Sequence, residues 1–536
     1  IFDECANFTS FNVSRENKEY LSIDGVLFSN DANELMQYPY GKAGNYIIPN
    51  ETHKIAEMAF YNCKGIDSVV IPNTITDIGQ SAFRGCIGLK NIIIPESVNS
   101  VGNQAFSGCV NLKTASIPSS LKKIPAFAFS ECTSLNNIII PDGITSIESS
   151  AFRGCSALLE ISVPQSVNAV GESVCVGTKW YDEQKDGIVY FGNVALGYKG
   201  EMPADTKLNL KNGTLGIASC AFERCENLVA VTLPNTVETI GYSAFGVCTA
   251  LSSINVPDSV KKICGAAFFG TKVYNEKPDG IVYFGNWVVD YKGEMGERAC
   301  LSIKDGTIGI ADNAFMGREQ MLEITIPNSL SYIGQSAFYE CKILRNVYMP
   351  SGIKEIEDST FGHCTSFTDV KIGENVTSIG EYAFDGCVGI NNLSIPKSVT
   401  SIGGCAFTGC LALLKAVIPK TVTSIGEIAF GFNINEANGQ CENIRNFKIV
   451  GAKNSKAQDY ASFYGIEFVI QQDCGDVNFD GKITSADAIA VLRAEAQLIE
   501  LSSLQKEQAD VTKDGRVTSG DAIKILRYEA QLISSF

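Results

Sequence analysis

The sequence predicts a mainly β fold, a solenoid of parallel strands with β-hairpin insertions, followed by a small all-α module at the C-terminal end. Two observations carry this prediction. Apolar residues recur with a 23-residue period over most of the chain, and two similar acidic segments set 34 residues apart then precede two amphipathic helical patterns. With 536 residues and 45% hydrophobic content, the chain can bury a core along its length.

The repeat is clearest in the segment IPNTITDIGQSAFRGCIGLKNIIIP, from Ile71 to Pro95. Each unit follows the pattern LxxIxIPxxVxxIGxxAFxxC, in which LxxIxI alternates as a short strand does and the glycine and proline mark bends. A fixed period of this size indicates a solenoid, because one unit cannot bury its apolar face alone and has to stack on its neighbours. The repeat phenylalanine keeps the period at Phe60, Phe83, Phe106, Phe129, Phe152, Phe222, Phe245, Phe268, Phe315, Phe338, Phe361, Phe384, Phe407 and Phe430.

This pattern resembles the BspA-like leucine-rich repeats of bacterial surface antigens over roughly residues 1–470. The resemblance implies a parallel leucine-rich repeat solenoid but no particular ligand, because the family includes adhesins and proteins of unknown role. Counting back from Cys5 places Phe2 at the repeat phenylalanine. We therefore expect the chain to begin inside a repeat, with any signal peptide outside this sequence.

The end of the repeat region predicts a cap. After Phe430 the period fades into a polar, helix-compatible stretch from Ser455 to Tyr464 and an apolar strand from Ile466 to Ile470. A terminal unit has to cover the open core with a polar outer face. We therefore assign residues 1–470 to the solenoid with its cap, and residues 471–536 to the second module.

Three segments interrupt the repeat. Two of them, WYDEQKDGIVYFGNVALGYKGEM from Trp180 and VYNEKPDGIVYFGNWVVDYKGEM from Val273, are copies of each other, and a related segment begins at Tyr20. Their strand and turn signals predict hairpins that replace or extend a coil. The copies are rich in aromatic residues, namely Trp180, Tyr181, Tyr190, Tyr198, Tyr274, Tyr283, Trp287 and Tyr291. These side chains either form an exposed platform for a sugar or pack the hairpins onto the solenoid, and packing is the favoured interpretation.

The solvent-facing strand position also permits two interpretations. It is apolar early in the chain, at Val70, Ile93 and Ile139, and more polar later, at Thr325, Tyr348 and Lys371. In a solenoid such a row can form an extended binding surface for a protein or a glycan. The same row also fits ordinary strand composition, in which β-branched residues are favoured.

Cysteine usage follows the repeat. Of 19 cysteines, twelve lie three residues after a repeat phenylalanine, at Cys5, Cys63, Cys86, Cys109, Cys132, Cys155, Cys225, Cys248, Cys341, Cys364, Cys387 and Cys410. A buried ladder of free thiols is favoured over a disulfide framework, because disulfide scaffolds are typical of small chains that lack a core. A metal site built on these cysteines is disfavoured, because the sequence has no CxxC pair and only two histidines.

The two acidic segments, DVNFDGKITSAD and DVTKDGRVTSGD, have the composition of calcium loops. Oxygen-bearing side chains stand at loop positions 1, 3, 5 and 12 with glycine at position 6, which lets a twelve-residue turn surround one hard cation. We expect two calcium ions. The predicted ligands are Asp476, Asn478, Asp480, the carbonyl of Lys482 and Asp487 in loop 1, and Asp510, Thr512, Asp514, the carbonyl of Arg516 and Asp521 in loop 2. The neutral hydroxyl of Thr512 is a poorer ligand than a carboxylate, so the second site is expected to be weaker.

Each loop precedes nearly the same helical segment, DAIAVLRAEAQLI or DAIKILRYEAQLI, with aspartate at position 12 and no helix expected before either loop. This arrangement resembles the dockerin family. The resemblance implies calcium-dependent binding to a cohesin module of a scaffoldin, and an extracellular, cellulosome-associated location in an anaerobic bacterium. By match to the family's motif, the cohesin contacts are Ser485, Ala486, Arg493 and Gln497 in the first copy and Ser519, Gly520, Arg527 and Gln531 in the second.

Other classes of function are disfavoured. A net charge of −16 without a basic run argues against nucleic acid and anionic membranes, and no apolar stretch is long enough to span a membrane. Neither His53 nor His363 stands in a catalytic motif. The expected function is a non-catalytic interaction subunit, the solenoid binding a protein or glycan. The alternative is a carbohydrate-active component with a sugar-binding or catalytic site in the aromatic hairpins.

Overall fold

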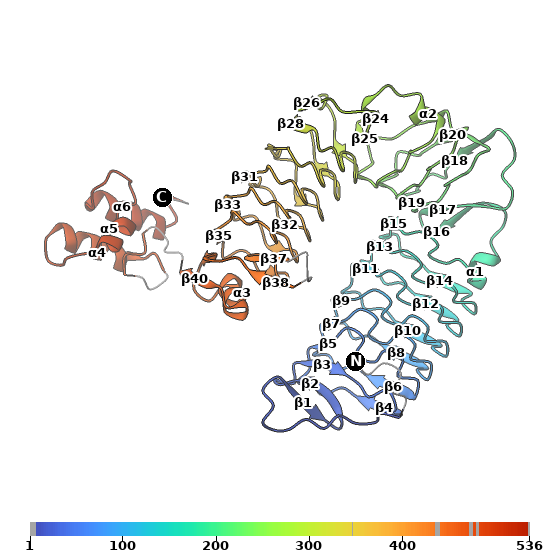
Figure 1. Ribbon diagram of the computed structural model, residues 1–536, viewed down its shortest axis with the longest axis horizontal. Coiled ribbons are helices and arrows are strands. Elements are labelled where there is room, and N and C mark those ends of the chain that lie inside the picture. The colour runs from blue at the N-terminus through green and yellow to red at the C-terminus, as the bar shows by residue number, and fades with distance from the viewer. Residues whose placement is uncertain (1–6, 346, 435–439, 471–474, 479–481, 534–536) are drawn as a thin grey trace. The chain divides into compact units, whose positions relative to one another are not determined.

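The computed structural model describes residues 7–345, 347–434, 440–470, 475–478 and 482–533. The chain divides into two compact units, Ile1–Glu294 with Thr307–Ala314, and Met295–Gly306 with Phe315–Phe536. Both units contain stacked parallel β coils, and the second also contains the helices of the C-terminal module (Figure 1). The predicted mainly β solenoid with a 23-residue period is confirmed.

Each regular coil supplies one strand to each of two faces. The long-strand face comes from the IxI segment of the repeat, and the short-strand face comes from the two residues before the glycine of IGxxAF. Neighbouring strands pair in parallel one period apart, as Asn91 does with Thr114 and Ile55 does with Ile78. Because every coil repeats the one before it, equivalent side chains stack on one another along the core.

In the first unit, the long-strand face contains β4 (Gly44–Ile47), β6 (Ile66–Val70), β8 (Asn91–Ile93), β10 (Thr114–Ser116), β12 (Asn137–Ile139), β14 (Glu160–Ser162), β18 (Thr206–Asn209), β20 (Leu228–Thr232) and β22 (Ser253–Ile254). Its short-strand face contains β5 (Lys54–Ile55), β7 (Asp77–Ile78), β9 (Ser100–Val101), β11 (Lys123–Ile124), β13 (Ser146–Ile147), β15 (Ala169–Val170), β19 (Gly216–Ile217), β21 (Thr239–Ile240), β23 (Lys262–Ile263) and β27 (Gly309–Ile310).

The repeat phenylalanines form a buried stack between the two faces. The rings of Phe60 and Phe83 lie 4.7 Å apart at an interplanar angle of 11°. The series continues to Phe152, where the last ring pair is 5.9 Å apart at 7°. These rings are almost fully buried, so the stack supplies apolar burial at every rung as well as offset aromatic contacts.

The bend after this stack requires left-handed backbone. Two residues after the phenylalanine, φ is positive, and glycine often occupies the position, as at Gly85 (74°) and Gly108 (71°). Val247 holds the same conformation at φ 58° despite its β-branched side chain. Two residues before the phenylalanine, φ is again positive, but side chains such as Ser81 (53°) occupy the position. Stacking of equivalent turns maintains this geometry, as the bond from the Ser81 N–H to the Asn103 carbonyl at 2.8 Å shows.

The interruptions are hairpins, as predicted, and each contributes a strand to the solenoid. The hairpins are β1 (Tyr20–Ile23) with β2 (Val26–Ser29) and β3 (Glu34–Gln37), β16 (Gly187–Phe191) with β17 (Val194–Lys199), and β24 (Gly280–Phe284) with β25 (Trp287–Lys292). The last strand of each pairs in parallel with the short-strand face, on β5, β19 and β27 respectively. The hairpins therefore replace part of a coil.

Two short helices that the sequence did not predict precede the duplicated hairpins, α1 (Lys179–Asp182) and α2 (Lys272–Asn275). A buried threonine caps each of them, and Thr178 accepts from the N–H of Tyr181 at 3.1 Å. A hairpin lysine lies at the other end, where Lys199 Nζ donates to the carbonyls of Asp182 and Gln184, both at 2.7 Å. These bonds satisfy carbonyls that a short helix leaves free.

In the second unit, the long-strand face contains β26 (Ala299–Ser302), β28 (Met321–Thr325), β31 (Asp369–Lys371), β33 (Asn392–Ser394), β35 (Lys415–Ile418), β39 (Lys448–Gly451) and β40 (Glu467–Ile470). The short-strand face contains β29 (Tyr332–Ile333), β30 (Glu355–Ile356), β32 (Ser378–Ile379), β34 (Ser401–Ile402) and β36 (Ser424–Ile425), and an antiparallel pair is formed by β37 (Phe432–Ile434) and β38 (Cys441–Asn443).

The predicted cap is present at the end of the second solenoid stack. Helix α3 (Lys456–Tyr464) ends at Gly465, whose φ of 65° matches a left-handed C-terminal cap, and β40 then pairs with β39. The hydroxyl of Tyr460 accepts from the N–H of Phe430 at 3.0 Å and donates to its carbonyl at 3.1 Å. The ring of Tyr460 meets that of Phe430 edge-on. The cap therefore closes the phenylalanine stack and satisfies the backbone of its last rung.

Candidate functional site

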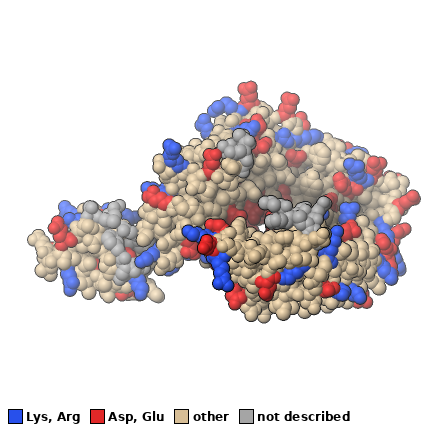
Figure 2. All heavy atoms as spheres, turned by 60° about the horizontal axis from the view of Figure 1, so that its bottom comes forward, with Lys and Arg blue, Asp and Glu red and all other residues tan. Residues whose placement is uncertain are grey.

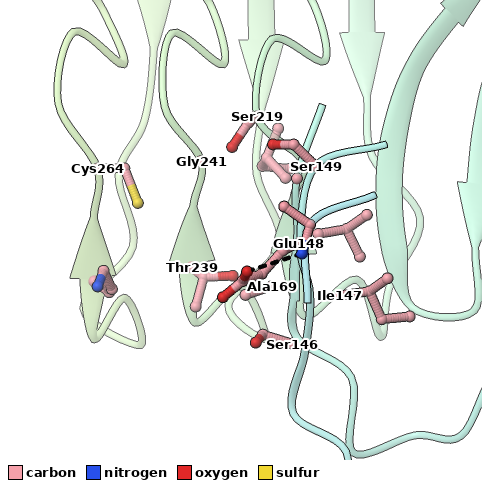
Figure 3. A pocket seen from close by; sticks show the side chains of 14 residues that line it. Ser146, Ile147, Glu148, Ser149, Ala169, Ser219, Thr239, Gly241 and Cys264 are labelled. Atoms are coloured by element: carbon pink, nitrogen blue, oxygen red, sulfur yellow. Dashed lines mark hydrogen bonds between the residues drawn. The ribbon is translucent and has the colours of Figure 1, made fainter. Parts of the chain in front are cut away.

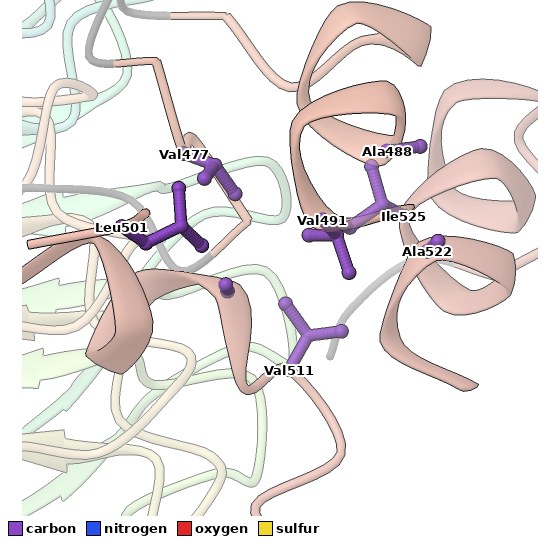
Figure 4. Packing of buried hydrophobic residues seen from close by; sticks show 8 residues of the cluster. Val477, Ala488, Val491, Leu501, Val511, Ala522 and Ile525 are labelled. Carbon is purple, nitrogen blue, oxygen red and sulfur yellow. The ribbon is translucent and has the colours of Figure 1, made fainter. Parts of the chain in front are cut away.

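The C-terminal module is built from three helices, α4 (Ser485–Glu495), α5 (Ser503–Ala509) and α6 (Ser519–Glu529). The sequence predicts α4 and α6, but the expectation that no helix precedes either loop is wrong for loop 2, because α5 leads directly into it with Asp510 as its C-cap. A small core of Val477, Ala488, Val491, Leu501, Ala509, Val511, Ala522 and Ile525 joins these elements. Figure 4 shows side chains from α4, α6 and both loops directed toward one another.

In loop 1, the position-12 carboxylate organises the backbone. Asp487 is fully buried, and its Oδ1 accepts from the N–H groups of Val477 at 2.8 Å and Asn478 at 3.1 Å. Its Oδ2 accepts from the N–H of Thr484, the N-cap of α4, at 2.9 Å, which completes a capping box. Asp476 is also buried, and Asp480 lies outside the described residues. One carboxylate thus ties the start of loop 1 to the start of α4.

Loop 2 is described in full and repeats this design. Asp521 is fully buried, its Oδ1 accepts from the N–H of Thr512 at 2.9 Å, and its Oδ2 accepts from the N–H of Thr518 at 2.9 Å. Asp510 accepts from the N–H groups of Asp514 at 3.1 Å and Gly515 at 2.8 Å. The carboxylate at position 12 therefore binds the backbone of position 3, and the carboxylate at position 1 binds the backbone of positions 5 and 6.

The donor chemistry fits a calcium ion. Each predicted side-chain ligand can offer an oxygen atom, and the buried carboxylates of Asp476, Asp487 and Asp521 would suit a hard cation. Among the residues that the structure describes, no three His, Cys, Asp or Glu side chains gather closely enough to hold a metal by themselves. The Asp514 carboxylate instead accepts from the N–H of Arg516 at 2.9 Å. The assignment of individual ligands, with Thr512 and the two carbonyls among them, stays a prediction.

The predicted cohesin contacts are all accessible. Ser485, Ala486, Arg493 and Gln497 are exposed, as are Ser519, Gly520, Arg527 and Gln531. Both glutamines follow a helix end and hold left-handed backbone, with φ of 57° and 56°. The hydroxyl of Ser519 donates to Glu495 Oε1 at 3.4 Å, which places the start of α6 beside the end of α4. The two copies of the motif therefore lie on antiparallel neighbouring helices.

The structure adds apolar residues that the sequence reasoning missed. Ile489, Leu492 and Leu498 are exposed in the first copy, and their equivalents Ile523, Leu526 and Leu532 are exposed in the second. Leu498 and Leu532 are each 74% exposed. The signal was available, because these residues recur at the same 34-residue spacing as the loops on the helix sides away from the core. Exposed apolar side chains beside arginines are typical of a protein-binding surface.

The hairpin aromatic side chains do not form an exposed platform. Trp287, Tyr274 and Tyr291 are buried, and the other members of the set are half-buried. Trp180 packs edge-on against Phe191, and the Tyr274 hydroxyl donates to Asp290 Oδ2 at 2.6 Å. The interpretation that these residues pack the hairpins is therefore favoured over a sugar platform.

The first unit contains a pocket of about 380 Å³ on its short-strand face (Figure 3). It lies where β15 meets β19, and the N–H of Ser219 donates to the Val170 carbonyl at 2.9 Å. Glu148 is the only carboxylate among its lining residues, and it pairs with Lys123 at 2.9 Å. Glycoside hydrolysis normally uses two facing carboxylates, whereas the described lining of this pocket contains one.

The ladder cysteines are buried free thiols, except Cys225, which is half-buried, and Cys5, which lies outside the described residues. They also hydrogen-bond, which the sequence reasoning did not anticipate. Cys109 Sγ donates to the Phe83 carbonyl at 3.1 Å, and the same contact to the preceding repeat phenylalanine recurs at Cys86, Cys132, Cys155, Cys248, Cys341, Cys364, Cys387 and Cys410. Burial raises the pKa of the Cys109 thiol well above its usual value. These thiols therefore stabilise the fold and are poor nucleophiles.

His363 lies beside a carboxylate and next to a ladder cysteine in the sequence. His363 Nε2 lies 3.5 Å from Asp385 Oδ2, and burial raises the pKa of that carboxyl. The neighbouring Cys364 is fully buried and donates to the Phe338 carbonyl at 3.1 Å, so it forms no dyad with His363. On the face in Figure 2, acidic and basic side chains are interspersed among many uncharged residues. In the described part of the chain, no helix is both long and apolar enough to cross a membrane.

Two solved structures illustrate the comparison with known proteins. A leucine-rich cell surface protein from Faecalibacterium prausnitzii is 25% identical, over 77% of this chain and 96% of that one, with a TM-score of 0.29. A leucine-rich repeat protein from Bacteroides ovatus is 23% identical, over 86% of this chain and all of that one, also with a TM-score of 0.29. These scores are too low to support an argument from superposition. No curated protein matches the chain.

The family matches agree with both modules. The BspA type leucine-rich repeat region matches in six copies over residues 53–179, 204–284 and 308–437, which together exceed half of the chain. The dockerin type I domain matches residues 474–528, which include both loops, α4 and α5 and nearly all of α6. The chain therefore belongs to the BspA-type leucine-rich repeat family and carries a type I dockerin domain at its C-terminal end.

Proposed function

We propose that this protein is a non-catalytic interaction subunit that a calcium-loaded dockerin anchors to a cohesin of a cellulosome scaffoldin. The observation that carries the proposal is the pair of equivalent surfaces on α4 and α6, each with the family's contact positions exposed beside exposed apolar residues. The same families support an extracellular or cell-surface location. Attachment through the dockerin leaves the solenoid available for another partner.

In the proposed mechanism, cohesin binding depends on calcium. When bound, the ion supplies positive charge to each oxygen cluster and fixes the turn that starts the next helix. The protein's own part is to hold the loop ends together through Asp487 and Asp521 and to cap α4 and α6 with Thr484 and Thr518. Recognition then depends on side chains whose positions follow from those helix starts.

Calorimetry with a type I cohesin tests the mechanism. Binding is expected in calcium and lost after chelation, because the loops then lose the charge that balances their carboxylates. The double substitution Asp476→Ala and Asp510→Ala should abolish binding. The control Asp142→Ala and Asp305→Ala, which removes two acidic residues from the solenoid, should retain it. Binding that survives chelation or the loop substitutions would rule the mechanism out.

The two arginines test the recognition surface. Because the copies are equivalent, a cohesin is proposed to bind either of them, in orientations related by a half turn. Arg493→Ala or Arg527→Ala alone should then change the Kd by about threefold or less, whereas the double substitution should weaken binding about a hundredfold. A single substitution with the full effect would show that only one copy is used.

We also propose that the solenoid binds a protein or glycan through its long-strand face. Ile93 and Ile139 are 74% and 70% exposed on that face, and Tyr348 is 74% exposed in the second unit. Affinity capture with the dockerin deleted, together with screens for polysaccharide binding and reducing-sugar release, separates this role from that of a carbohydrate-active component. Sugar release by the purified protein would favour the carbohydrate-active alternative.

A further inference from the structure

The pocket on the short-strand face of the first unit lies at a break in the strand ladder. Strand β17 pairs with β19 through Val194 and Ala195, whereas just after β19 the N–H of Ser219 donates to the Val170 carbonyl of β15 at 2.9 Å. Coils on both sides of the break therefore line one hollow of about 380 Å³, with β13 and β15 on one side and β19, β21 and β23 on the other (Figure 3). A hollow of this size can hold a small ligand.

Polar bonds across the break hold the rim of this pocket together. The Thr239 hydroxyl donates to the Asn168 carbonyl, and Asn168 Nδ2 donates to Glu238 Oε2 at 3.2 Å. The partners lie 71 and 70 residues apart in the sequence, so these bonds join the coil of β15 directly to the coil of β21. A pocket whose walls are bonded to each other is already formed before a ligand arrives, which lowers the cost of binding.

Three serine hydroxyls in the lining are not used by the fold. Ser146, Ser149 and Ser219 are half-buried, and among the described residues none is a hydrogen-bond partner of their hydroxyls. In Figure 3, Ser149 and Ser219 lie toward one end of the pocket and Ser146 toward the other. A serine hydroxyl can both donate and accept, so each of the three can pair with a hydroxyl group of a ligand.

The lining carries no net charge. Glu148 and Lys262 are the charged residues in the described lining, one of each sign. The Glu148 carboxylate is already occupied, because its Oε1 pairs with Lys123 at 2.9 Å and its Oε2 accepts from the N–H of Ala126 at 3.1 Å. The side chains of Ala126 and Ala169 add methyl groups. An uncharged ligand with several hydroxyls and a C–H surface matches this lining, whereas a buried ion would lack a partner for its charge.

We propose that this pocket binds a sugar unit of a neutral glycan, with the serine hydroxyls bonded to sugar hydroxyls and the alanine methyl groups against the C–H face of the ring. The free groups of the lining are side-chain hydroxyls, which favours a sugar over an extended peptide that pairs its backbone with a strand edge. This inference goes beyond the proposed function, because the site lies on the short-strand face and depends neither on calcium nor on the dockerin.

Saturation-transfer NMR and calorimetry on the full-length protein test the site. The probes are neutral oligosaccharides of glucose, xylose and mannose, with an acidic oligogalacturonide and a gelatin digest for contrast. At least one neutral oligosaccharide is expected to bind, and the oligogalacturonide should bind at least about tenfold more weakly. Ser149→Ala and Ser219→Ala should each weaken binding about three- to tenfold, the effect of losing one neutral hydrogen bond. Ala169→Trp, which fills the pocket, should abolish binding.

Ser100→Trp is the matched control. Ser100 begins β9 as Ala169 begins β15, on the same face but outside the lining, so this substitution should leave binding unchanged. Equal urea midpoints check that the variants are folded, and the two serine variants decide the question if Ala169→Trp is not. The inference is overturned if no neutral oligosaccharide binds, if the oligogalacturonide or the gelatin digest binds better, or if both serine variants bind as the unsubstituted protein does. Binding that survives Ala169→Trp but is lost with Ile93→Asp and Ile139→Asp would place the glycan on the long-strand face instead.

Discussion

Replacing Cys109 with alanine measures what the thiol ladder contributes to the solenoid. Cys109 is fully buried, and its Sγ donates to the Phe83 carbonyl at 3.1 Å. That carbonyl also accepts from the N–H of Cys86 at 3.2 Å, so the substitution does not leave it without a partner. The cost is therefore the net value of one hydrogen bond, about 1 kcal/mol, plus the burial of one methylene-sized atom, about 1 kcal/mol. We expect the free energy of unfolding to fall by about 2 kcal/mol.

Cys175 provides the matched control. It is also buried, but it stands at a repeat phenylalanine position and makes no ladder bond to a phenylalanine carbonyl. Cys175→Ala therefore removes the same atom without the hydrogen bond, and it should cost about 1 kcal/mol less than Cys109→Ala.

Urea unfolding followed by tryptophan fluorescence is the assay. Trp180 and Trp287 both lie in the unit that contains Cys109 and Cys175, so the signal reports the relevant stack. Equal losses of stability in the two variants would refute the hydrogen-bonding role and leave the thiols as apolar filler only.

Three further predictions concern pH, backbone strain and the cap. Burial raises the pKa of the Cys63 thiol from 9.0 to about 12, and it also raises the pKa of other ladder thiols. In the unfolded chain these thiols ionise at lower pH than in the folded protein. The free energy of unfolding should therefore stay constant below pH 9 and fall between pH 9 and pH 12, by about 1.4 kcal/mol per pH unit for each such thiol. Unchanged urea midpoints between pH 8 and pH 10.5 would contradict this. Val247→Gly should raise the melting temperature, because it relieves left-handed backbone strain of about 1–2 kcal/mol, which exceeds the entropic cost of glycine. The control is Val388→Gly, at a valine of similar exposure without positive φ, and this substitution should lower the melting temperature. Tyr460→Phe should destabilise the second unit by about 2 kcal/mol, because it removes the hydroxyl that hydrogen-bonds both the N–H and the carbonyl of Phe430. Faster amide hydrogen exchange in β36 and α3 would report this loss. Exchange equal to that of the unsubstituted protein would show that the cap does not depend on this hydroxyl.

Periodicity determined most of the fold. The 23-residue spacing of the phenylalanines predicts parallel coils, since only stacking can bury a repeated apolar face, and the cap from Ser455 to Ile470 follows from the point where that spacing fades. The duplicated segments likewise predicted helices α4 and α6. Asp521 and Thr512 meet because a twelve-residue turn leaves few other positions for them.

Local contacts that have no period were not predictable. The short helices α1 and α5 depend on caps and on contacts with a neighbouring segment, such as the bonds from Lys199 to the carbonyls of Asp182 and Gln184. The sequence shows Lys199 on a strand, but only the folded hairpin brings it to the helix end.

Partners and exposure were decided by the tertiary structure. Composition made Trp287 and Tyr291 candidates for a sugar platform, but the hairpin is part of the solenoid and both side chains are buried there. Cys109 was expected to be a small apolar residue, and stacking of the coils at one fixed offset placed its sulfur beside the Phe83 carbonyl. The sequence pattern determines which residues lie on the same face of the solenoid. Which atoms come into contact depends on the distance and offset between neighbouring coils, and packing of the side chains sets both.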